Sequence, residues 1–171
     1  MVLKMIELRR LSVDDGIDVY QLLQDIPKLE NGYNNSANGL SYEEYKEWLI
    51  KKHNDSLQVG LVDGWRVPQI TYFLYVDGVP VGSGSVRTFL TDSLRKVGGH
   101  IGYTISPNYR SKGYGKEILR LLLIEAKKIG IDKVLVTANV NNIRSQRVAL
   151  SNGGVLTDKD DEHVRIWIDN K

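Results

Sequence analysis

Hydrophobic residues alternate with polar ones, or form short apolar runs, in seven segments of the chain. Patterns of this length and period predict β-strands. The dipeptide Asp77-Gly78 separates the second segment from the third and predicts a tight hairpin turn. The fifth segment is apolar almost throughout, which is typical of a strand covered on both faces. The seven segments are 5–11, 71–76, 81–90, 100–106, 133–139, 155–160 and 163–169.

Four other segments carry the longer hydrophobic period of amphipathic helices. Two of them open on a capping box, in which a serine and an acidic residue three positions later bond each other's backbone amides. The boxes are Ser12 with Asp15 and Ser41 with Glu44. The sequence therefore predicts two helices before residue 71.

The remaining two helices follow the strand at 100–106 and the strand at 133–139. The first is leucine-rich, and the second starts at Asn141 or Asn142, both good N-cap residues. The order is strand, two helices, three strands, helix, strand, helix, two strands. This order predicts an α+β fold with a mixed, mostly antiparallel sheet of about six to seven strands, flanked by about four helices. One parallel strand–helix–strand unit is expected, with a right-handed crossover.

Composition narrows the class of protein. The chain has 171 residues, which predicts a single domain over 1–171, with 42% hydrophobic and 26% charged residues, as in ordinary soluble proteins. Its net charge of +2 is too small to indicate nucleic acid or a membrane surface as a partner. The absence of cysteine excludes disulfides and a thiol nucleophile. With neither a signal peptide nor a long apolar run, we expect a cytoplasmic protein.

A basic, glycine-bearing segment joins the strand at 100–106 to the leucine-rich helix. It fails the P-loop template, since Glu117 follows Gly115-Lys116, and the dinucleotide template, since Ile118 replaces the third glycine. Two glycines before a helix still expose unpaired amides to a phosphate or pyrophosphate. The alternative is a turn with solvated basic side chains.

The segment Arg110-Ser-Lys-Gly113-Tyr-Gly115 resembles the Arg/Gln-x-x-Gly-x-Gly/Ala signature of the GNAT superfamily of acetyl-CoA-dependent N-acetyltransferases. Downstream, Asn142-x-x-Ser145 resembles the next element of the family, in the form closest to the branch that acetylates ribosomal-protein N-termini and polyamines. The resemblance implies a GNAT-like fold for the whole chain.

The resemblance also implies roles for residues that would bind acetyl-CoA. Backbone amides from Ser111 to Lys116, with the Arg110 side chain, would hold the pyrophosphate. The backbone of Ile105 would pair with the pantetheine arm between splayed strands, and Asn142 would bond its end. The coenzyme-binding set is Ile105, Arg110, Ser111, Lys112, Gly113, Tyr114, Gly115, Lys116 and Asn142.

The acid and base of the reaction are open at this stage. Many members of the family carry a tyrosine where this chain has Ala149, and a glutamate on the strand that here reads VGGHIGYTIS. His100 and Tyr103 are the catalytic candidates, as base and proton donor. A regular strand would place them on opposite faces. The acidic run 158–163 is interpreted as a solvated hairpin connection, and no metal is expected.

The predicted function is transfer of the acetyl group of acetyl-CoA to a primary amine, of a small molecule or a peptide N-terminus, by direct attack. The alternatives are an acetyl-CoA-binding sensor and a phosphate-binding protein or nucleotide hydrolase, which the failed templates disfavour. The loops 27–40 and 57–70, with Tyr33, Trp65 and Arg66, are candidates to line the acceptor pocket. A homodimer is compatible with a fold of this size.

Overall fold

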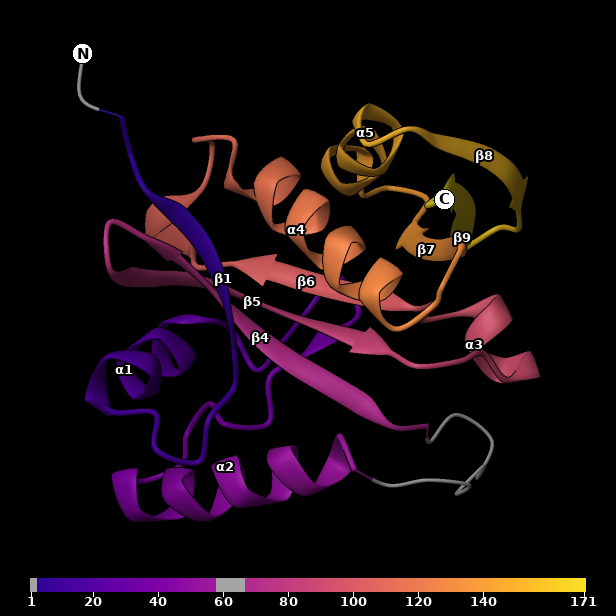
Figure 1. Cartoon of the computed structure of the whole chain (residues 1–171). Coiled ribbons are helices and arrows are strands. Elements are labelled where there is room, and N and C mark those ends of the chain that lie inside the picture. Colours follow the sequence, from indigo (N-terminus) through magenta and orange to yellow (C-terminus); the bar gives the residue numbers. More distant parts are fainter. Residues whose placement is uncertain (1–2, 58–66) are drawn as a thin grey trace.

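The computed structural model describes residues 3–57 and 67–171, and Figure 1 shows their arrangement. Long strands alternate with helices in the predicted order. The helices are α1 (Ile17–Asp25), α2 (Tyr42–Asp55), α3 (Asp92–Lys96), α4 (Tyr114–Lys128) and α5 (Ile143–Ser151), with a 3-10 turn at Pro107–Tyr109. The strands are β1 (Ile6–Arg10), β2 (Leu29–Glu30), β3 (Tyr33–Asn34), β4 (Gln69–Val76), β5 (Val79–Arg87), β6 (Ile101–Ile105), β7 (Lys133–Asn139), β8 (Gly154–Lys159) and β9 (His163–Asp169).

The seven long strands form two antiparallel sheets. One has the order β1-β4-β5-β6 and the other β7-β9-β8, while β2 and β3 make a separate two-residue hairpin. Helix α4 lies on one face of the larger sheet, and α1 and α2 lie on the other (Figure 1). The α+β class expected from the sequence is therefore confirmed.

Strands β6 and β7 bring the two sheets together. The amide of His100, just before β6, donates to the carbonyl of Leu135 in β7 over 2.9 Å. No ladder pairs the two strands beyond this point in the described residues. Both strands run away from the junction, and residues of both line one cavity, so they lie side by side and splay. This is the expected parallel unit, β6-α4-β7, opened at its far end.

Each face of the larger sheet has its own core. The core between the sheet and α4 includes Leu119 and Leu122 of α4, both fully buried, and the core between the sheet and α1–α2 includes Phe73 of β4 and Leu49 of α2. Truncation of one such leucine to alanine costs about 2–5 kcal/mol. The rest of the α1–α2 face, toward β6, is polar, and this half of the face lines the cavity.

Local sequence signals are confirmed at two turns. Ser41 and Glu44 form the predicted capping box at the start of α2, with bonds of 2.9 and 3.2 Å. Asp77 and Gly78 both have positive φ, as a type I′ hairpin turn requires.

One local expectation is wrong, and two short features are absent from the prediction. The amide of Ser12 bonds Asp15 over 2.9 Å, but this closes a turn, and α1 begins only at Ile17 after Gly16. The hairpin β2–β3 and the single-turn helix α3 were not predicted. Both are too short to show a hydrophobic period.

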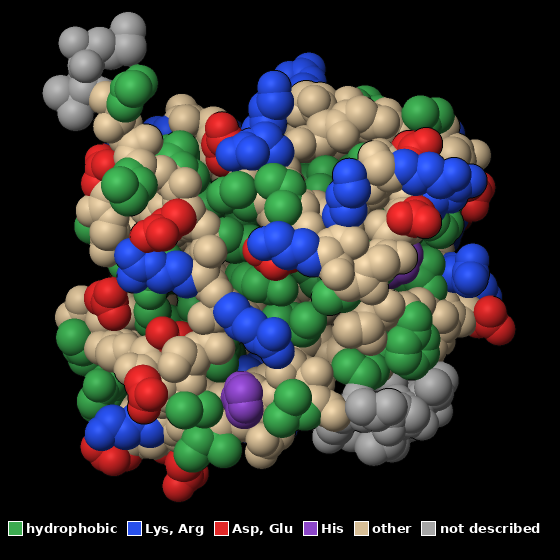
Figure 2. Space-filling view, in the orientation of Figure 1, with side chains coloured by type: hydrophobic (Ala, Val, Ile, Leu, Met, Phe, Trp, Pro, Cys, Tyr) green, Lys and Arg blue, Asp and Glu red, His purple; other side chains and the backbone are tan. Residues whose placement is uncertain are grey.

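Charges of both signs are mixed on the face shown in Figure 2, in keeping with the small net charge. Among the helices of the described residues, none combines the length and apolar character needed to cross a membrane.

Candidate active site

A cavity of about 630 Å³ opens where β6 and β7 splay. It has two sides, which we name by what forms them. The loop side consists of residues 109–116 and the first turns of α5. The sheet side consists of the β2–β3 hairpin, α2, and the polar half of β4 and β5. Strands β6 and β7 lie between the two sides.

The loop side ends at an open helix terminus. Gly113 is the N-cap of α4, with φ +85°, and no side chain caps the helix there. The first backbone bond of the helix is from the Glu117 amide to the Gly113 carbonyl, at 3.3 Å. The amides of residues 114–116 therefore have no partner within the helix. Ser111 also has positive φ, +63°, and such turns point successive amides toward one spot. Amides, the helix dipole and Lys116 together make this spot attractive to an anion.

The Arg110 side chain is not directed to this spot. Its Nε donates to the Ile105 carbonyl over 3.0 Å, and its other nitrogens pair with the carboxylate of Glu30. Arg110 thus ties the loop side to the β2–β3 hairpin of the sheet side. This position differs from the pyrophosphate contact that the resemblance implied for the side chain.

Strand β6 turns unpaired backbone groups toward β7. The Ser106 amide donates to the Val81 carbonyl of β5, and Arg87 of β5 donates to the His100 carbonyl. In an antiparallel pair the residues alternate in direction, so Tyr103 and Ile105 turn their backbone groups to the opposite edge. Because β6 is the edge of its sheet, these groups face the cavity.

His100 lies at the junction of the sheets and outside the cavity lining. Its Nδ1 accepts from the Leu135 amide over 2.9 Å, while its own amide bonds the Leu135 carbonyl. Burial, with smaller contributions from Arg95 and Arg87, lowers the pKa of the imidazole to about 4. His100 is therefore a neutral residue that joins β6 to β7 by hydrogen bonds. Because it lies outside the cavity, it does not fit the role of catalytic base predicted for it.

Tyr103 does line the cavity, on the loop side. Its hydroxyl lies 3.4 Å from the hydroxyl of Ser145 on α5. Burial raises the pKa of Tyr103, so the phenol keeps its proton at neutral pH. Asn142 is the N-cap of α5 and accepts from the Ser145 amide over 3.2 Å. The cap and cavity positions of Asn142 are compatible, as expected.

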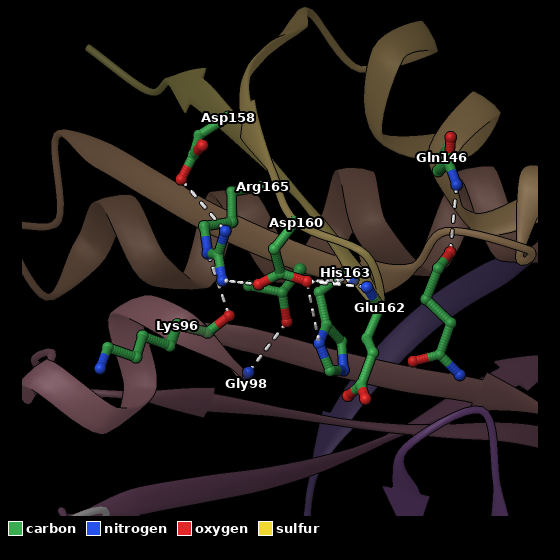
Figure 3. Close-up of polar contacts among 10 residues, drawn as sticks. Lys96, Gly98, Gln146, Asp158, Asp160, Glu162, His163 and Arg165 are labelled. Atoms are coloured by element: carbon green, nitrogen blue, oxygen red, sulfur yellow. Dashed lines mark hydrogen bonds and ion pairs between the residues drawn. The ribbon is translucent and has the colours of Figure 1, made fainter.

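His163 is a cavity residue that the sequence analysis did not single out. It begins β9, opposite Asn139 at the end of β7. Figure 3 shows it beside Asp160, whose Oδ1 accepts from the His163 amide over 2.8 Å and lies 3.9 Å from the imidazole Nδ1. The amide of Glu162 and the Arg165 guanidinium lower the pKa of Asp160, so its carboxylate stays ionised.

Two carboxylates of the acidic run are held by one cation. Arg165 pairs with Asp158 and Asp160 and donates to the Lys96 carbonyl (Figure 3). Across the residues that the structure describes, no group of three potential metal ligands comes together. The run is a hairpin connection, as interpreted from the sequence.

The sheet side is polar. The Tyr33 hydroxyl bonds the Ser83 hydroxyl over 2.8 Å, and Arg87 and Lys52 also line the cavity. Trp65 and Arg66, two of the predicted acceptor residues, lie outside the described residues.

Comparison with known proteins agrees with this arrangement. A family model for the acetyltransferase (GNAT) domain matches residues 6–155. The chain therefore belongs to the GNAT acetyltransferase family, and the predicted enzyme class, an acyltransferase, is confirmed. A search of curated proteins gives no match.

Solved structures share the fold at low sequence identity. One is RimL, a ribosomal L7/L12 alpha-N-protein acetyltransferase in complex with coenzyme A: 17% identity, TM-score 0.69, covering 97% of this chain and 96% of that chain. A second is a spermidine N-acetyltransferase SpeG chimera from Vibrio cholerae and hSSAT, with 14% identity and a TM-score of 0.64, covering 96% of this chain and 95% of that chain. A third is the Campylobacter jejuni N-acetyltransferase PseH in complex with acetyl coenzyme A, with 13% identity and a TM-score of 0.63, covering 98% of this chain and 100% of that chain.

Proposed function

We propose that this protein transfers the acetyl group of acetyl-CoA to a primary amine by direct attack of the amine on the thioester. The observation that carries the proposal is the splayed opening between β6 and β7, which joins unpaired backbone groups of β6 to the open N-terminus of α4. The opening suits an extended donor with a pyrophosphate at one end. Relatives solved with coenzyme A or acetyl-CoA support this choice of donor.

The loop side would bind the coenzyme end of the donor. The amides of residues 114–116 would hold the pyrophosphate, and Lys112 and Lys116 would add positive charge. A second, shallower hollow beside the loop is lined by Lys116, Arg144 and Arg147. Its cations fit the additional phosphate that coenzyme A carries on its ribose.

The backbone of β6 would position the thioester. The amides of Tyr103 and Ile105 face the cavity, and an amide there can donate to the carbonyl oxygen as it gains negative charge. The Ile105 carbonyl already accepts from Arg110, so its amide is the group left for the donor. The proposed role of Ile105 is thus a backbone contact, as the resemblance implied for the pantetheine arm.

The cavity also offers groups for both proton transfers. His163, with the Asp160 carboxylate beside it, would take the proton that the amine loses as its nitrogen forms the new C–N bond. When the C–S bond breaks, the leaving thiolate would take a proton from the Tyr103 hydroxyl. The Ser145 hydroxyl, 3.4 Å away, would hydrogen-bond the tyrosine oxygen. No covalent intermediate on the protein is needed.

The test is release of the coenzyme A thiol from acetyl-CoA in the presence of a panel of amines. His163→Gln is expected to lower kcat by about a hundredfold or more, because a positioned base contributes at least that much. Its matched control is His53→Gln on α2, outside the cavity lining, which should leave kcat unchanged. Both variants should bind acetyl-CoA as the wild type does.

A regulator that binds acetyl-CoA without transfer is the second candidate. It would show acetyl-CoA binding and no thiol release with any amine of the panel. A His163→Gln variant with full activity would contradict the proposed role of His163.

A further inference from the structure

The sheet side of the cavity is positively charged. Among its described lining residues, Arg87 and Lys52 are cations, and Glu30 is the only carboxylate. Glu30 is already paired with Arg110. The sheet side therefore has two cations and, among its described lining residues, no carboxylate left to balance them.

Arg87 is a partly buried cation held by neutral groups. It ends β5, and its Nη1 donates to the carbonyls of Gly98 and Gly99 over 3.1 and 3.2 Å. These bonds fix the guanidinium in place. Its Nε and Nη2 have no hydrogen-bond partner among the described residues, although a guanidinium has five N–H donors. Removing a cation from water without a counter-charge costs free energy, so buried cations are normally paired.

Lys52 approaches the same space from α2. Its ammonium lies 5.7 Å from the centre of the Trp48 ring, which also lines the cavity. Burial lowers the pKa of Lys52; Asp55 on the same helix opposes this shift, while Lys51 and Arg87 add to it to smaller degrees. Burial likewise lowers the pKa of Arg87. Each protein cation would therefore be stabilised by an anion placed between them.

The floor below these cations can bind oxygen atoms. Thr71 of β4 and Ser83 and Ser85 of β5 are buried, line the cavity, and carry hydroxyls on the face that α1 and α2 cover elsewhere. Polar residues here cannot be explained by core packing, because the same face is apolar at Phe73 and Tyr75. A ligand with several oxygen acceptors would use both the cations and the hydroxyls.

We propose that the acceptor amine carries an anionic group, a carboxylate or a phosphate ester, which Arg87 and Lys52 bind on the sheet side. This inference rests on the proposed acetyl transfer and names the class of its acceptor. The anion would anchor the acceptor at one end and present its amine to the thioester between β6 and β7. Polyamines, which are cations throughout, would be repelled from the same site.

The experiment compares matched acceptors that differ only in the anionic group. L-amino acids are compared with their carboxamides, phosphoethanolamine with ethanolamine, and spermidine is added, with thiol release from acetyl-CoA as the readout. In at least one pair the anionic member is expected to show a kcat/KM about tenfold higher, since charge-assisted bonds are the stronger ones. In a carboxamide a larger fraction of the amine is neutral and reactive than in the amino acid. This difference favours the carboxamide, so a preference for the amino acid cannot come from amine protonation. The two pairs separate a carboxylate from a phosphate.

Lys52→Met tests the site without removing the bonds of Arg87 to the backbone. It should raise KM for the preferred anionic acceptor about tenfold and leave kcat/KM for the neutral partner and the affinity for acetyl-CoA unchanged. Lys46→Met is the matched control, because Lys46 stacks on Tyr42 of the same helix outside the cavity lining. Arg87→Lys should have the same direction of effect as Lys52→Met.

Two failures are distinguishable. Thiol release that is equal for anionic and neutral acceptors, or an equal effect of Lys52→Met on both, overturns this inference and leaves acetyl transfer in place. Normal acetyl-CoA binding with no thiol release from any acceptor overturns the proposed transfer, and this inference with it.

Discussion

The two sides of the cavity are built in different ways. On the loop side, the groups proposed to hold the pyrophosphate are backbone amides, two glycines and one helix terminus, all within residues 110–116. The sheet side uses side chains from β2–β3, α2, β4 and β5, which lie far apart in the sequence. A site made of backbone needs a short, recognisable sequence, whereas a site made of side chains depends on the whole fold. A donor site of this kind can therefore be predicted from the sequence, whereas an acceptor site made of distant side chains cannot.

Gly113→Val is expected to have the largest effect, and it acts on the loop side alone. Valine does not tolerate φ near +85°, so the loop would leave the conformation that points its amides at one spot. We expect the Kd for acetyl-CoA to rise at least about a hundredfold, close to the loss of two charge-assisted bonds. Isothermal calorimetry measures it.

The control for this variant is Gly130→Val. Gly130 has φ +88° and, like Gly113, no atom within 4 Å of an added Cβ, but it lies at the far end of α4. The same backbone strain there should lower stability without changing the Kd. If both variants bind acetyl-CoA equally well, the loop does not hold the donor.

The acid side of the stability profile tests the junction where the two sides meet. The folded-state pKa of His100, about 4, lies below the ordinary value of 6.5. The unfolded chain therefore binds the proton first, and the contribution of His100 to stability is complete above pH 6.5 and is lost as pH falls through 4. Between pH 7.5 and 4.5 the loss should be about 2.5 kcal/mol. Urea unfolding at the two pH values measures it.

His100→Asn isolates this contribution. The asparagine oxygen takes the place of Nδ1 as acceptor for the Leu135 amide and does not titrate. The variant should lose about 2.5 kcal/mol less than the wild type over the same pH interval. Equal pH dependence of stability in the wild type and His100→Asn would contradict the claim that His100 joins β6 to β7 as a neutral imidazole.

Arg110→Gln should have the smallest effect, although it joins the two sides. The side chains of Arg110 and Glu30 are about one-third exposed, and pairs of this kind contribute about 1 kcal/mol or less. Because the guanidinium is held by Glu30 and Ile105, we expect the Kd for acetyl-CoA to change less than about threefold, or about 0.7 kcal/mol. Arg120→Gln on α4, which removes an exposed pair with Glu117, is the control. A tenfold rise in Kd would restore the phosphate contact implied by the family signature.

The sequence predicts the fold well where periodicity is long. All seven long strands and the helices α1, α2, α4 and α5 follow from hydrophobic patterns, and Asn142, one of the two expected N-cap residues, caps α5. What it cannot predict is the pairing of side chains from distant elements. Arg110 pairs with Glu30, 80 positions away, and Tyr103 of β6 contacts Ser145 of α5.

His100 and His163 show the same limit in opposite directions. His100 lies in the stretch predicted as the strand before the loop, which made it a catalytic candidate, yet in the fold it precedes β6 and joins β6 to β7. His163 lies in an acidic run that resembles a surface hairpin, and antiparallel pairing of β9 with β7 brings it to the cavity. The sequence feature that could have pointed to His163 is Asp160, three positions earlier. Asp160 approaches the imidazole only because the β8–β9 hairpin folds the two residues together.

Titration of isotope-labelled protein with acetyl-CoA, followed residue by residue in amide NMR spectra, tests the central claim most directly. The account predicts the largest shifts at the amides of 111–116, with further shifts at Tyr103 and Ile105 on β6, and little change at Gly130 beyond α4. Saturable binding that leaves the amides of 111–116 and of β6 unmoved would contradict it.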